Sequence, residues 1–370
     1  MVTNYIEARY DMSNIFSKGA TMSMDHTAHN DYLAEPIAKI MKKYRLAGKV
    51  LVINADQSNQ DIEGFGYADK KHLRYNQNPN VLYPSASLQK SMTAAMMIQI
   101  INESKFTSSP ISEDTPIARW YPDLNKGANI TISQLLTHTS GIVDLKSEHD
   151  PGFIMTEDQA IQATVNRINA SKLSLNHFYY DNDNYILLAG IIRQETHMSY
   201  ADNLNQRIIR PLKLTQTVMW HDLDTHGGTP AVSYRSFGPW QYRQPRTATP
   251  QLMSYIVGAG NLYTTPDDYL KFQRGLHNSQ ILDVHGYEQL THQPDRPNNG
   301  YSGGMYHRRH GKLKKVYGYL RDTHYRNWVQ LSSDSQYGII LFTNQSRSSI
   351  GVKRAAHEIL QLFSDQFDAK

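Results

Sequence analysis

The sequence contains no cysteine in its 370 residues. Disulfide bonds, thiol nucleophiles and thiolate-bound metal sites are therefore excluded, and an exported bacterial protein fits this composition. The 16 histidines are scattered and form no H-x-x-x-H or H-x-H pair. Because such spacings commonly supply metal ligands, we expect no catalytic metal, and nothing in the sequence points to another cofactor.

Long apolar runs are also missing. No stretch approaches 18 apolar residues, so we expect no transmembrane helix. The first residues, MVTNYIEARYDMSNIF, lack the apolar centre of a signal peptide. We therefore expect the mature or truncated form of an extracytoplasmic protein, secreted or on the cell surface, whose signal or anchor is absent from this chain. A cytoplasmic protein is the alternative.

The positive charge is modest. The net charge is +4, and Lys312–Lys315 (KLKK) is the one basic run that stands out. A nucleic-acid-binding protein usually has a denser basic patch, so no nucleic-acid partner is expected, whereas an anionic envelope polymer is compatible with this charge. The 24 tyrosines suit groove walls that bind polar ligands, although surface packing accounts for most of them. The oligomeric state is left open.

The order of the expected elements predicts the architecture. Residues 1–30 are polar and are interpreted as an arm, and residues 31–370 as the catalytic domain. Residues 215–262 read as loop-like. Hydrophobic periodicity elsewhere predicts helices over 31–44, 87–101, 132–136, 157–169, 184–195, 265–276 and 351–367, and strands over 49–54, 62–68, 313–320, 327–332 and 337–343.

Strands at both ends of the chain flank a helical middle. The simplest arrangement is one mixed or antiparallel sheet built from about 31–84 and 263–370, with a helical lobe over about 85–262. The groove between the two lobes is the expected site.

A serine and a lysine stand one helical turn apart in Ser87-Leu88-Gln89-Lys90, which opens an apolar helix. Residues three apart on a helix share a face, so the amine can reach the hydroxyl. A serine hydroxyl needs a base, and a desolvated lysine can serve as one. The helix N-terminus adds positive potential where an oxyanion would form. S-x-x-K occurs once here, but the pattern alone favours an exposed helical Ser and Lys.

The second pattern is Tyr180-Asp181-Asn182. A phenol can relay a proton, and an asparagine amide can hydrogen-bond a substrate. The same spacing occurs at Tyr325-Arg326-Asn327. Tyr180 precedes an Asn-rich turn and the apolar helix NYILLAGII, so Tyr180 is the functional candidate and Tyr325 the structural one. His138, in LLTHTSG, is interpreted as buried and structural.

With these motifs in view, the chain resembles the β-lactamase-related serine hydrolases, which include penicillin-binding proteins, D,D-peptidases, class C β-lactamases and related esterases. The resemblance runs from about Gly48 to Asn344 in the family's order. It rests on the segments LYPSASLQKSMTAAMM, ITISQLLTHTSGI, FYYDNDNYILLAGII, RPLKLTQT, GAGNLYTTPDDYLKF and IILFTNQ.

The resemblance implies a five-stranded, mostly antiparallel sheet flanked by helices, plus a helical lobe. It also implies that Ser87 forms an acyl-enzyme, that Lys90 and Tyr180 share the general base and acid roles, and that Asn182 holds the substrate. The oxyanion hole would use the backbone N–H of Ser87 and a second N–H from the inner edge strand.

The family's third motif departs from its pattern here. A Lys or His, a small residue and Gly are expected on the edge strand, but the chain reads Lys315-Val316-Tyr317-Gly318-Tyr319-Leu320-Arg321. We expect Tyr317 at the cationic position, Leu320 N–H as the second oxyanion donor, and Arg321 as a charge for phosphate or carboxylate. His226-Gly227-Gly228 fits the triplet but stands too early in the chain.

The missing cation normally binds a substrate carboxylate, so its loss argues against efficient β-lactam hydrolysis. The favoured function is a serine acyl hydrolase acting on a cell-envelope D-alanyl ester or related small ester. The alternatives are a D,D-carboxypeptidase or peptidoglycan peptidase, and a degenerate family member that binds wall polymer without turnover.

Overall fold

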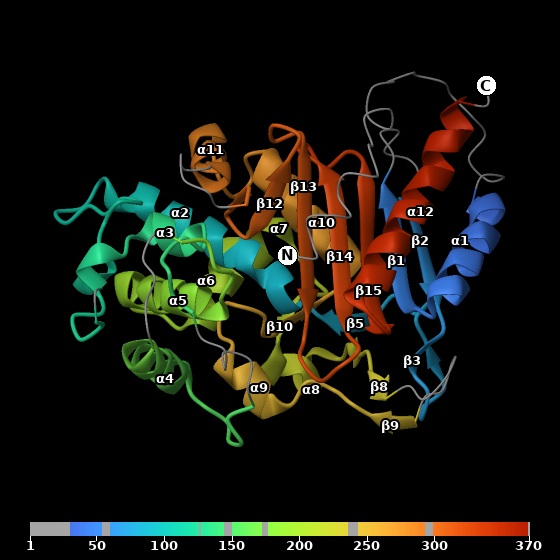
Figure 1. The fold of residues 1–370 in the computed structure, drawn as a ribbon, viewed down its shortest axis with the longest axis horizontal. Helices are drawn as coiled ribbons and strands as arrows, with labels where there is room; N and C mark the ends of the chain where they lie inside the picture. The colour runs from blue at the N-terminus through green and yellow to red at the C-terminus, as the bar shows by residue number, and fades with distance from the viewer. Residues whose placement is uncertain are drawn as a thin grey trace.

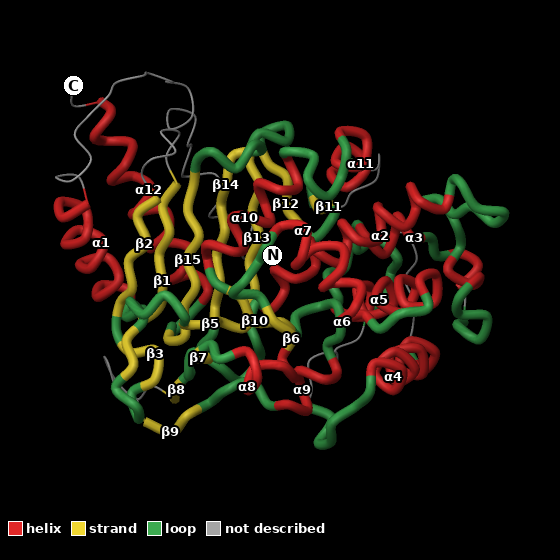
Figure 2. Tube along the Cα trace, turned by 180° about the vertical axis from the view of Figure 1, so that it is seen from behind, coloured by secondary structure: helices red, strands yellow, loops and turns green. Residues whose placement is uncertain are grey.

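Both ends of the chain contribute to one seven-stranded sheet, in the order β11-β12-β13-β14-β15-β1-β2. The computed structural model describes residues 30–53, 60–125, 127–143, 150–171, 177–235, 243–292 and 299–368, so the predicted arm lies outside the described residues apart from its last residue. The strands are β1 Ala47–Ile53, β2 Gln60–Phe65, β11 Tyr301–Ser302, β12 Met305–Arg308, β13 Leu313–Tyr319, β14 Arg326–Ser332 and β15 Gly338–Gln345. Figure 2 shows them as adjacent yellow strands.

Every neighbouring pair in this sheet is antiparallel. The five predicted strands form β13-β14-β15-β1-β2, which confirms the fold class. The predicted count of five strands is wrong, because the hairpin β11–β12 adds two strands beyond β13. Two strands of two and four residues are too short to show a clear alternation of apolar residues.

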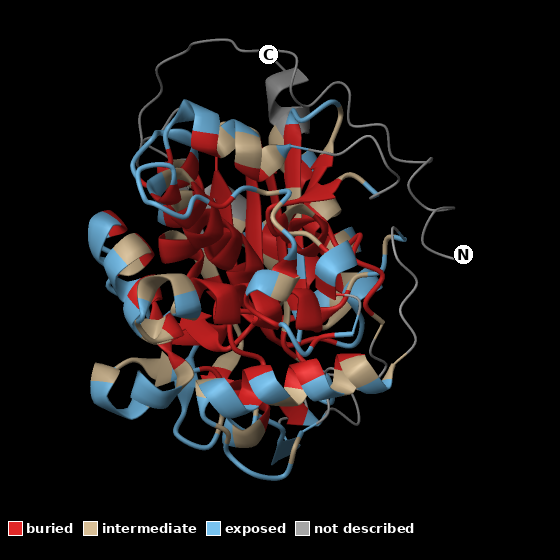
Figure 3. Ribbon diagram, turned by 90° about the vertical axis from the view of Figure 1, so that its left-hand side faces the viewer, coloured by how far each residue is buried: buried red, intermediate tan, exposed pale blue. Residues whose placement is uncertain are grey.

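Helices cover both faces of the sheet (Figure 1). On the outer face, α1 (Asn30–Tyr44) and α12 (Ser349–Asp368) enclose a small core that includes Ile37, Met41 and Trp328. The larger core lies between the opposite face and the helical lobe. Figure 3 shows this buried interior continuing from the strands into the helices.

The helical lobe is built around two apolar helices, α2 (Lys90–Ser104) and α5 (Asn182–Thr196). Around them lie α3 Ile132–Leu136, α4 Glu157–Ala170, α6 Tyr200–Leu204, the π-helical turn Asn205–Ile209, α7 Arg210–Leu212, α8 Leu223–His226, α9 Pro250–Tyr255, α10 Pro266–His277 and α11 Val284–Thr291. Single 3-10 turns occur at Ala86–Gln89, Ile117–Arg119, Gly127–Asn129 and Trp220–Asp222.

The described residues between 215 and 262 contain more regular structure than the predicted loop. They contain α8 and α9 and contribute to a four-stranded sheet in the order β6-β10-β5-β7. Its strands are β5 Val81–Pro84, β6 Val218–Met219, β7 Thr229–Pro230 and β10 Leu262–Thr264, and two further pairs join β3 Tyr67–Asp69 to β4 Arg74–Tyr75 and β8 Tyr234–Arg235 to β9 Arg243–Pro245. Elements of two to six residues carry too little periodicity for detection.

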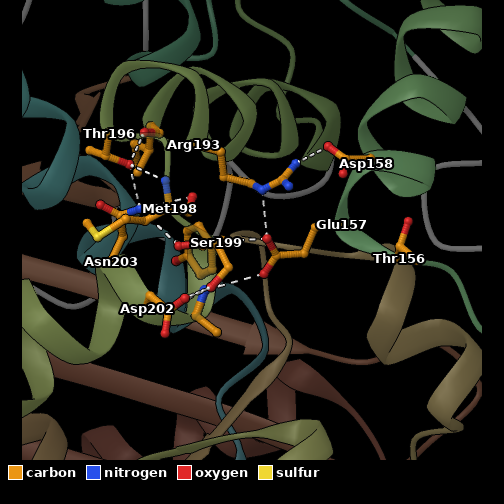
Figure 4. A network of polar contacts seen from close by, with 12 residues as sticks. Thr156, Glu157, Asp158, Arg193, Thr196, Met198, Ser199, Asp202 and Asn203 are labelled. Carbon is orange, nitrogen blue, oxygen red and sulfur yellow. Dashed lines mark hydrogen bonds and ion pairs between the residues drawn. The ribbon is translucent and has the colours of Figure 1, made fainter.

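A polar network fastens three helices of the helical lobe together (Figure 4). Glu157, at the start of α4, accepts from the backbone N–H of Tyr200 at 2.8 Å and that of Ala201 at 3.3 Å, which caps α6. The same carboxylate lies 2.8 Å from Arg193 Nε, near the end of α5. Because α5 carries the Y-x-N segment at its other end, this network stiffens the support of the site.

Within the residues that the structure describes, no helix combines the length and apolarity needed to cross a membrane.

The buried side chain of Lys314, on β13, makes the stability of the fold depend on pH. Its side chain is 1% exposed, its ammonium donates to Ser335 Oγ at 2.8 Å, and burial lowers its pKa from 10.5 to about 7. Between pH 7 and 10.5 the unfolded chain therefore binds more protons at this site, so its contribution to stability rises with pH. We predict that Lys314→Met raises the free energy of unfolding by about 1–3 kcal/mol below pH 7, and that the gain fades toward pH 10.5.

Urea unfolding at pH 6, 8 and 10 measures this difference. Lys312→Met, at an exposed neighbouring position, is the control and should change stability little at any pH. A gain that is independent of pH would contradict the explanation.

Candidate active site

Ser87 lies in a tight turn that directly precedes α2. Residues Ala86–Gln89 form a 3-10 turn and α2 begins at Lys90, so Ser87 precedes the α-helix that was predicted to include it. Ala86 has a positive φ of 46°, which is uncommon for a residue with a side chain. Ser87 itself is half-buried, whereas its neighbours Leu88 and Lys90 are fully buried. Strained backbone of this kind is often found at functional sites.

The side chain of Lys90 joins three segments of the chain. Its Nζ lies 2.9 Å from Ser87 Oγ, 2.7 Å from Asn182 Oδ1 and 3.0 Å from the carbonyl oxygen of Ala259. The S-x-x-K pair predicted from the sequence therefore meets, and the structure adds Asn182 to it. A buried amine needs such partners because transfer from water is costly without them.

Two of these partners fix the direction of the third contact. The oxygens of Asn182 and Ala259 can only accept, so each accepts a hydrogen bond from Lys90. The remaining tetrahedral position of Nζ faces Ser87 Oγ. In the neutral amine this position holds a lone pair that can accept the serine proton, and in the ammonium it holds a proton. The geometry is therefore that of a base directed at one hydroxyl.

Tyr180 lies on the other side of the lysine. Its ring centroid is 5.0 Å from Lys90 Nζ, and the ring is half-buried. Asp181 caps α5 by accepting from the N–H of Asp183 at 3.0 Å, and Asn182 is the first residue of that helix. The helix thus fixes the backbone from which the Tyr180 and Asn182 side chains project.

His138 packs beneath Tyr180. The two ring centroids are 4.3 Å apart, and a third ring, Tyr301, is 4.7 Å from His138. Burial, reinforced by the positive charge of Lys90, holds the pKa of His138 well below its usual value, so its imidazole is neutral. Its Nδ1 lies 3.1 Å from Asn184 Nδ2, and its carbonyl accepts from Tyr179 N–H at 2.9 Å. The predicted burial of His138 is confirmed.

A small pocket opens beside the serine. Its lining brings together the predicted residues Ser87, Asn182, Tyr319, Leu320 and Arg321. Ala86, Leu252, Ile256, Ala259 and Gly260 complete the lining. Among these described lining residues Arg321 is the only one that carries a formal charge.

Gly318 holds β13 against the nucleophile turn. A methyl group in place of its hydrogen would lie 2.8 Å from Ser87 N and 3.2 Å from Ser85 O. Because both atoms belong to the backbone, only glycine permits this approach. The contact brings the end of β13 beside the N–H of Ser87, where the predicted oxyanion hole lies.

Tyr317 differs from its neighbours on β13. It is not among the pocket's lining residues; its ring stacks between Tyr306 and Trp328, at centroid distances of 5.3 and 5.8 Å. The structure thus places Tyr319, rather than Tyr317, beside Ser87. The two other candidates from the sequence also lie outside this lining: Tyr325 is buried with its hydroxyl donating to Ala231 O at 2.7 Å, and His226 is in contact with Thr215 O at 2.9 Å.

Sequence reasoning missed two contributors. The carbonyl of Ala259 contacts Lys90, although GAGNL served only to support the resemblance. Tyr301, from the unpredicted hairpin, lies 5.6 Å from Tyr180, ring to ring. The segment Tyr301-Ser302-Gly303-Gly304-Met305-Tyr306 carried a usable signal, because Gly-Gly between short apolar runs is typical of a two-residue hairpin turn.

Within the described part of the chain, no three His, Asp or Glu side chains gather in a way that could hold a metal ion. The polar groups that these described residues place around Ser87 are the Lys90 amine, the Asn182 amide, phenol and guanidinium side chains, and backbone.

The fold and this site define a class of protein, the serine hydrolases with a lysine one turn after the serine. The family model described as Beta-lactamase matches residues 33–362. The chain therefore belongs to the beta-lactamase family, which confirms the resemblance seen in its motifs.

Relatives and solved structures agree with this assignment. The teichoic acid D-alanine hydrolase of Staphylococcus aureus is 29% identical over 234 residues, covering 62% of this chain and 54% of the relative. This chain therefore spans about half the length of that curated relative. Two crystal structures share the fold at 22% identity: FmtA from Staphylococcus aureus, with a TM-score of 0.71 over 93% of this chain and 91% of the other, and the D-amino acid amidase from Ochrobactrum anthropi, with 0.73 over 92% and 100%.

We predict that a fluorophosphonate probe labels Ser87, and that Ser87→Ala abolishes both labelling and turnover. The reason is the position of Lys90, whose amine can accept the Ser87 proton. Ser91→Ala is the matched control, because the Ser91 hydroxyl is buried and donates to Leu88 O at 2.8 Å. Mass spectrometry that locates the adduct on any other serine would contradict the assignment.

We also predict that Gly318→Ala lowers kcat while the protein stays folded. The added methyl must push β13 away from Ser87 N, and loss of one oxyanion donor typically reduces kcat about 10²–10³-fold. Gly127→Ala is the control, since its methyl would meet its neighbours at 3.4 Å or more. Equal kcat values for the two variants, with unchanged melting temperatures, would show that β13 does not take part.

Proposed function

We propose that this protein is a serine acyl hydrolase that cleaves D-alanyl esters on a cell-envelope polymer through an acyl-enzyme. The observation that carries the proposal is the Lys90 contact set, in which a buried amine faces Ser87 Oγ inside a pocket rimmed by Tyr319, Leu320 and Arg321. The teichoic acid D-alanine hydrolase among its relatives supports the substrate class. An extracytoplasmic location follows from such a substrate.

In the proposed first step Lys90 accepts the Ser87 proton as Oγ attacks the ester carbonyl. The carbonyl oxygen becomes an oxyanion held by the Ser87 N–H and an N–H from the Tyr319–Arg321 segment, with Leu320 as the expected donor. Tyr180 protonates the leaving alcohol oxygen as the ester C–O bond breaks, and Lys90 passes the Ser87 proton to Tyr180, while the acyl group stays on Ser87.

In the second step water attacks the acyl-enzyme and loses a proton to the same Lys90–Tyr180 relay. The Ser87 oxygen leaves and is reprotonated, which releases the acid and restores the enzyme. Asn182 accepts from Lys90 through its Oδ1, and an amide also donates through its N–H₂, which suits it to hydrogen-bond an acyl carbonyl.

Arg321 suits a particular kind of ester. A guanidinium at the pocket's rim can form a charge-assisted hydrogen bond with a phosphate of the alcohol portion. The lining described above has no acidic side chain to repel such a group.

A second candidate activity, D,D-carboxypeptidase, also draws on Arg321, because the same guanidinium could bind a terminal carboxylate. The two activities therefore predict different preferences for substrates of similar size.

We predict that ester cleavage exceeds both penicillin acylation and D-alanyl-D-alanine cleavage. The Lys or His that binds a carboxylate in the family is missing, and such a charge-assisted contact is worth about 1.5–3 kcal/mol, or roughly 10- to 150-fold in rate. The test compares kcat/KM for a D-alanyl ester and a D-alanyl-D-alanine peptide with the second-order acylation constant for benzylpenicillin.

Equal rates for ester and dipeptide would mean that another cation binds the carboxylate, and the esterase preference would then be wrong. Arg321→Gln identifies that cation, because it should then slow the dipeptide by the same 10- to 150-fold while leaving a neutral ester unaffected.

A further inference from the structure

The hairpin β12–β13 carries positive charge without any acidic residue. From Asn299 to Arg321 the sequence contains no Asp or Glu and six basic residues. One of them, Lys314, is buried and faces the interior. The other five are half-buried or exposed: Arg308, Arg309, Lys312, Lys315 and Arg321. The proposed catalytic steps use Arg321 alone among these five.

Two tyrosines stand on the same face of β13 as Lys315. Tyr317 is 42% and Tyr319 44% exposed, whereas Val316, Gly318 and Leu320 between and beside them are buried. Alternate residues of a strand face the same way, so Lys315, Tyr317 and Tyr319 form one row.

The Tyr317 ring is held rigidly within this row. It is nearly parallel to Tyr306 on one side and to Trp328 on the other, with interplanar angles of 5° and 13°, and its hydroxyl donates to Tyr306 at 3.1 Å. A ring already fixed by stacking loses little conformational entropy when a ligand packs against it.

This row leads into the catalytic pocket. Tyr319 and Arg321 line the pocket with Ser87, and Lys315 lies four residues before Tyr319. At a rise of about 3.3 Å per residue, the row from Lys315 to the pocket is roughly 13 Å long. A bound chain of several repeat units would therefore reach from the surface to the nucleophile.

Helix α12 adds further positive charge beside the row. Lys353 Nζ lies 5.9 Å from the centroid of the Trp328 ring on which Tyr317 stacks. Burial, together with the positive charges of Lys315 and Lys353, lowers the pKa of His357 to about 4. The ammonium groups of Lys315 on β13 and Lys353 on α12 therefore both lie near His357. Figure 1 shows α12 running along β14 and β15, and β14 lies next to β13 in the sheet.

We propose that the basic strip, made of Arg309, Lys312, Lys315, Tyr317, Tyr319 and Arg321, binds a polyanionic, phosphodiester-linked polyol chain and guides its ester groups to Ser87. The inference rests on the proposed function and extends it from the ester to the polymer. Cations with no acid between them fit repeated phosphates, and the exposed rings fit the polyol or sugar units between them. A membrane surface would meet the same charges, but it would not supply a chain that enters the pocket.

The test uses the full-length triple variant Arg309→Gln, Lys312→Gln, Lys315→Gln. Its substrates are D-alanylated poly(glycerol phosphate) and a small D-alanyl ester. We expect KM for the polymer to rise at least tenfold, with kcat on the polymer and kcat/KM on the small ester within twofold of wild type. The difference should shrink at 1 M salt, because salt screens exposed charges.

The triple variant Lys71→Gln, Arg74→Gln, Lys105→Gln is the control, with the same change in charge at exposed positions around the β3–β4 hairpin and after α2. An unchanged polymer KM in the strip variant, or an equal rise in the control, would overturn the proposal. So would a loss of binding to phosphatidylglycerol vesicles with polymer kinetics unaffected, which would assign the strip to a membrane surface.

Failure of the proposed function can be separated from failure of the strip. Binding of unesterified poly(glycerol phosphate) to Ser87→Ala, with and without the three strip substitutions, needs no catalysis. One outcome is that the wild type cleaves no D-alanyl ester while the strip substitutions lower the polymer affinity of Ser87→Ala at least tenfold. That result would contradict the proposed function and support the strip as a polymer-binding surface. If the three strip substitutions leave the polymer affinity of Ser87→Ala unchanged, the proposal for the strip is overturned.

Discussion

A lysine side chain withdrawn from water is the constraint on which the site depends. Lys90 is fully buried, and three oxygens surround its Nζ, two of which, from Asn182 and Ala259, come from distant parts of the chain. A buried amine stays charged only if hydrogen-bond acceptors contact its N–H groups. It can act as a base when those acceptors leave one position of the nitrogen facing a hydroxyl. Asn182 and Ala259 must therefore stay where they are for Ser87 to be activated. The α5 cap and the Glu157–Arg193 network can be understood as support for that requirement.

Close backbone contact is the second constraint, and glycine makes it possible. Gly318 brings β13 beside Ser87, and Gly304 brings the β11–β12 turn against the first residues of α2, where a methyl group would lie 2.3 Å from Ser91 N. Side chains at either position would separate the strands from the nucleophile turn. Tyr301 contacts His138 and Tyr180 from this same hairpin. The two strands that the sequence did not predict therefore also supply one of the rings that pack at the site.

The motifs and the five central strands could be predicted because each depends on local pattern. Ser87 and Lys90 are three residues apart, and β1 and β15 each contain a run of four apolar residues, VLVI and IILF. The position of the third motif could not be predicted in the same way. Whether Tyr317 or Tyr319 reaches the pocket depends on the twist of β13 and on stacking against Trp328, a residue eleven positions further along the chain. The hairpin β11–β12 escaped notice because its strands are too short for periodicity to show.

In the proposed function the pocket carries out the chemistry and the strip binds the polymer. This separation follows from the absence of the Lys or His that the family has in its third motif. Without a carboxylate contact at the scissile bond, less of the substrate's binding energy arises at the reacting group. Binding energy from remote parts of a substrate can supply the positioning that catalysis requires. A hairpin with five surface cations and two exposed tyrosines offers that energy only to a long anionic substrate. Under the proposed function, selectivity for a polymer follows from the position of the charge, which extends from Arg321 in the pocket along the strip.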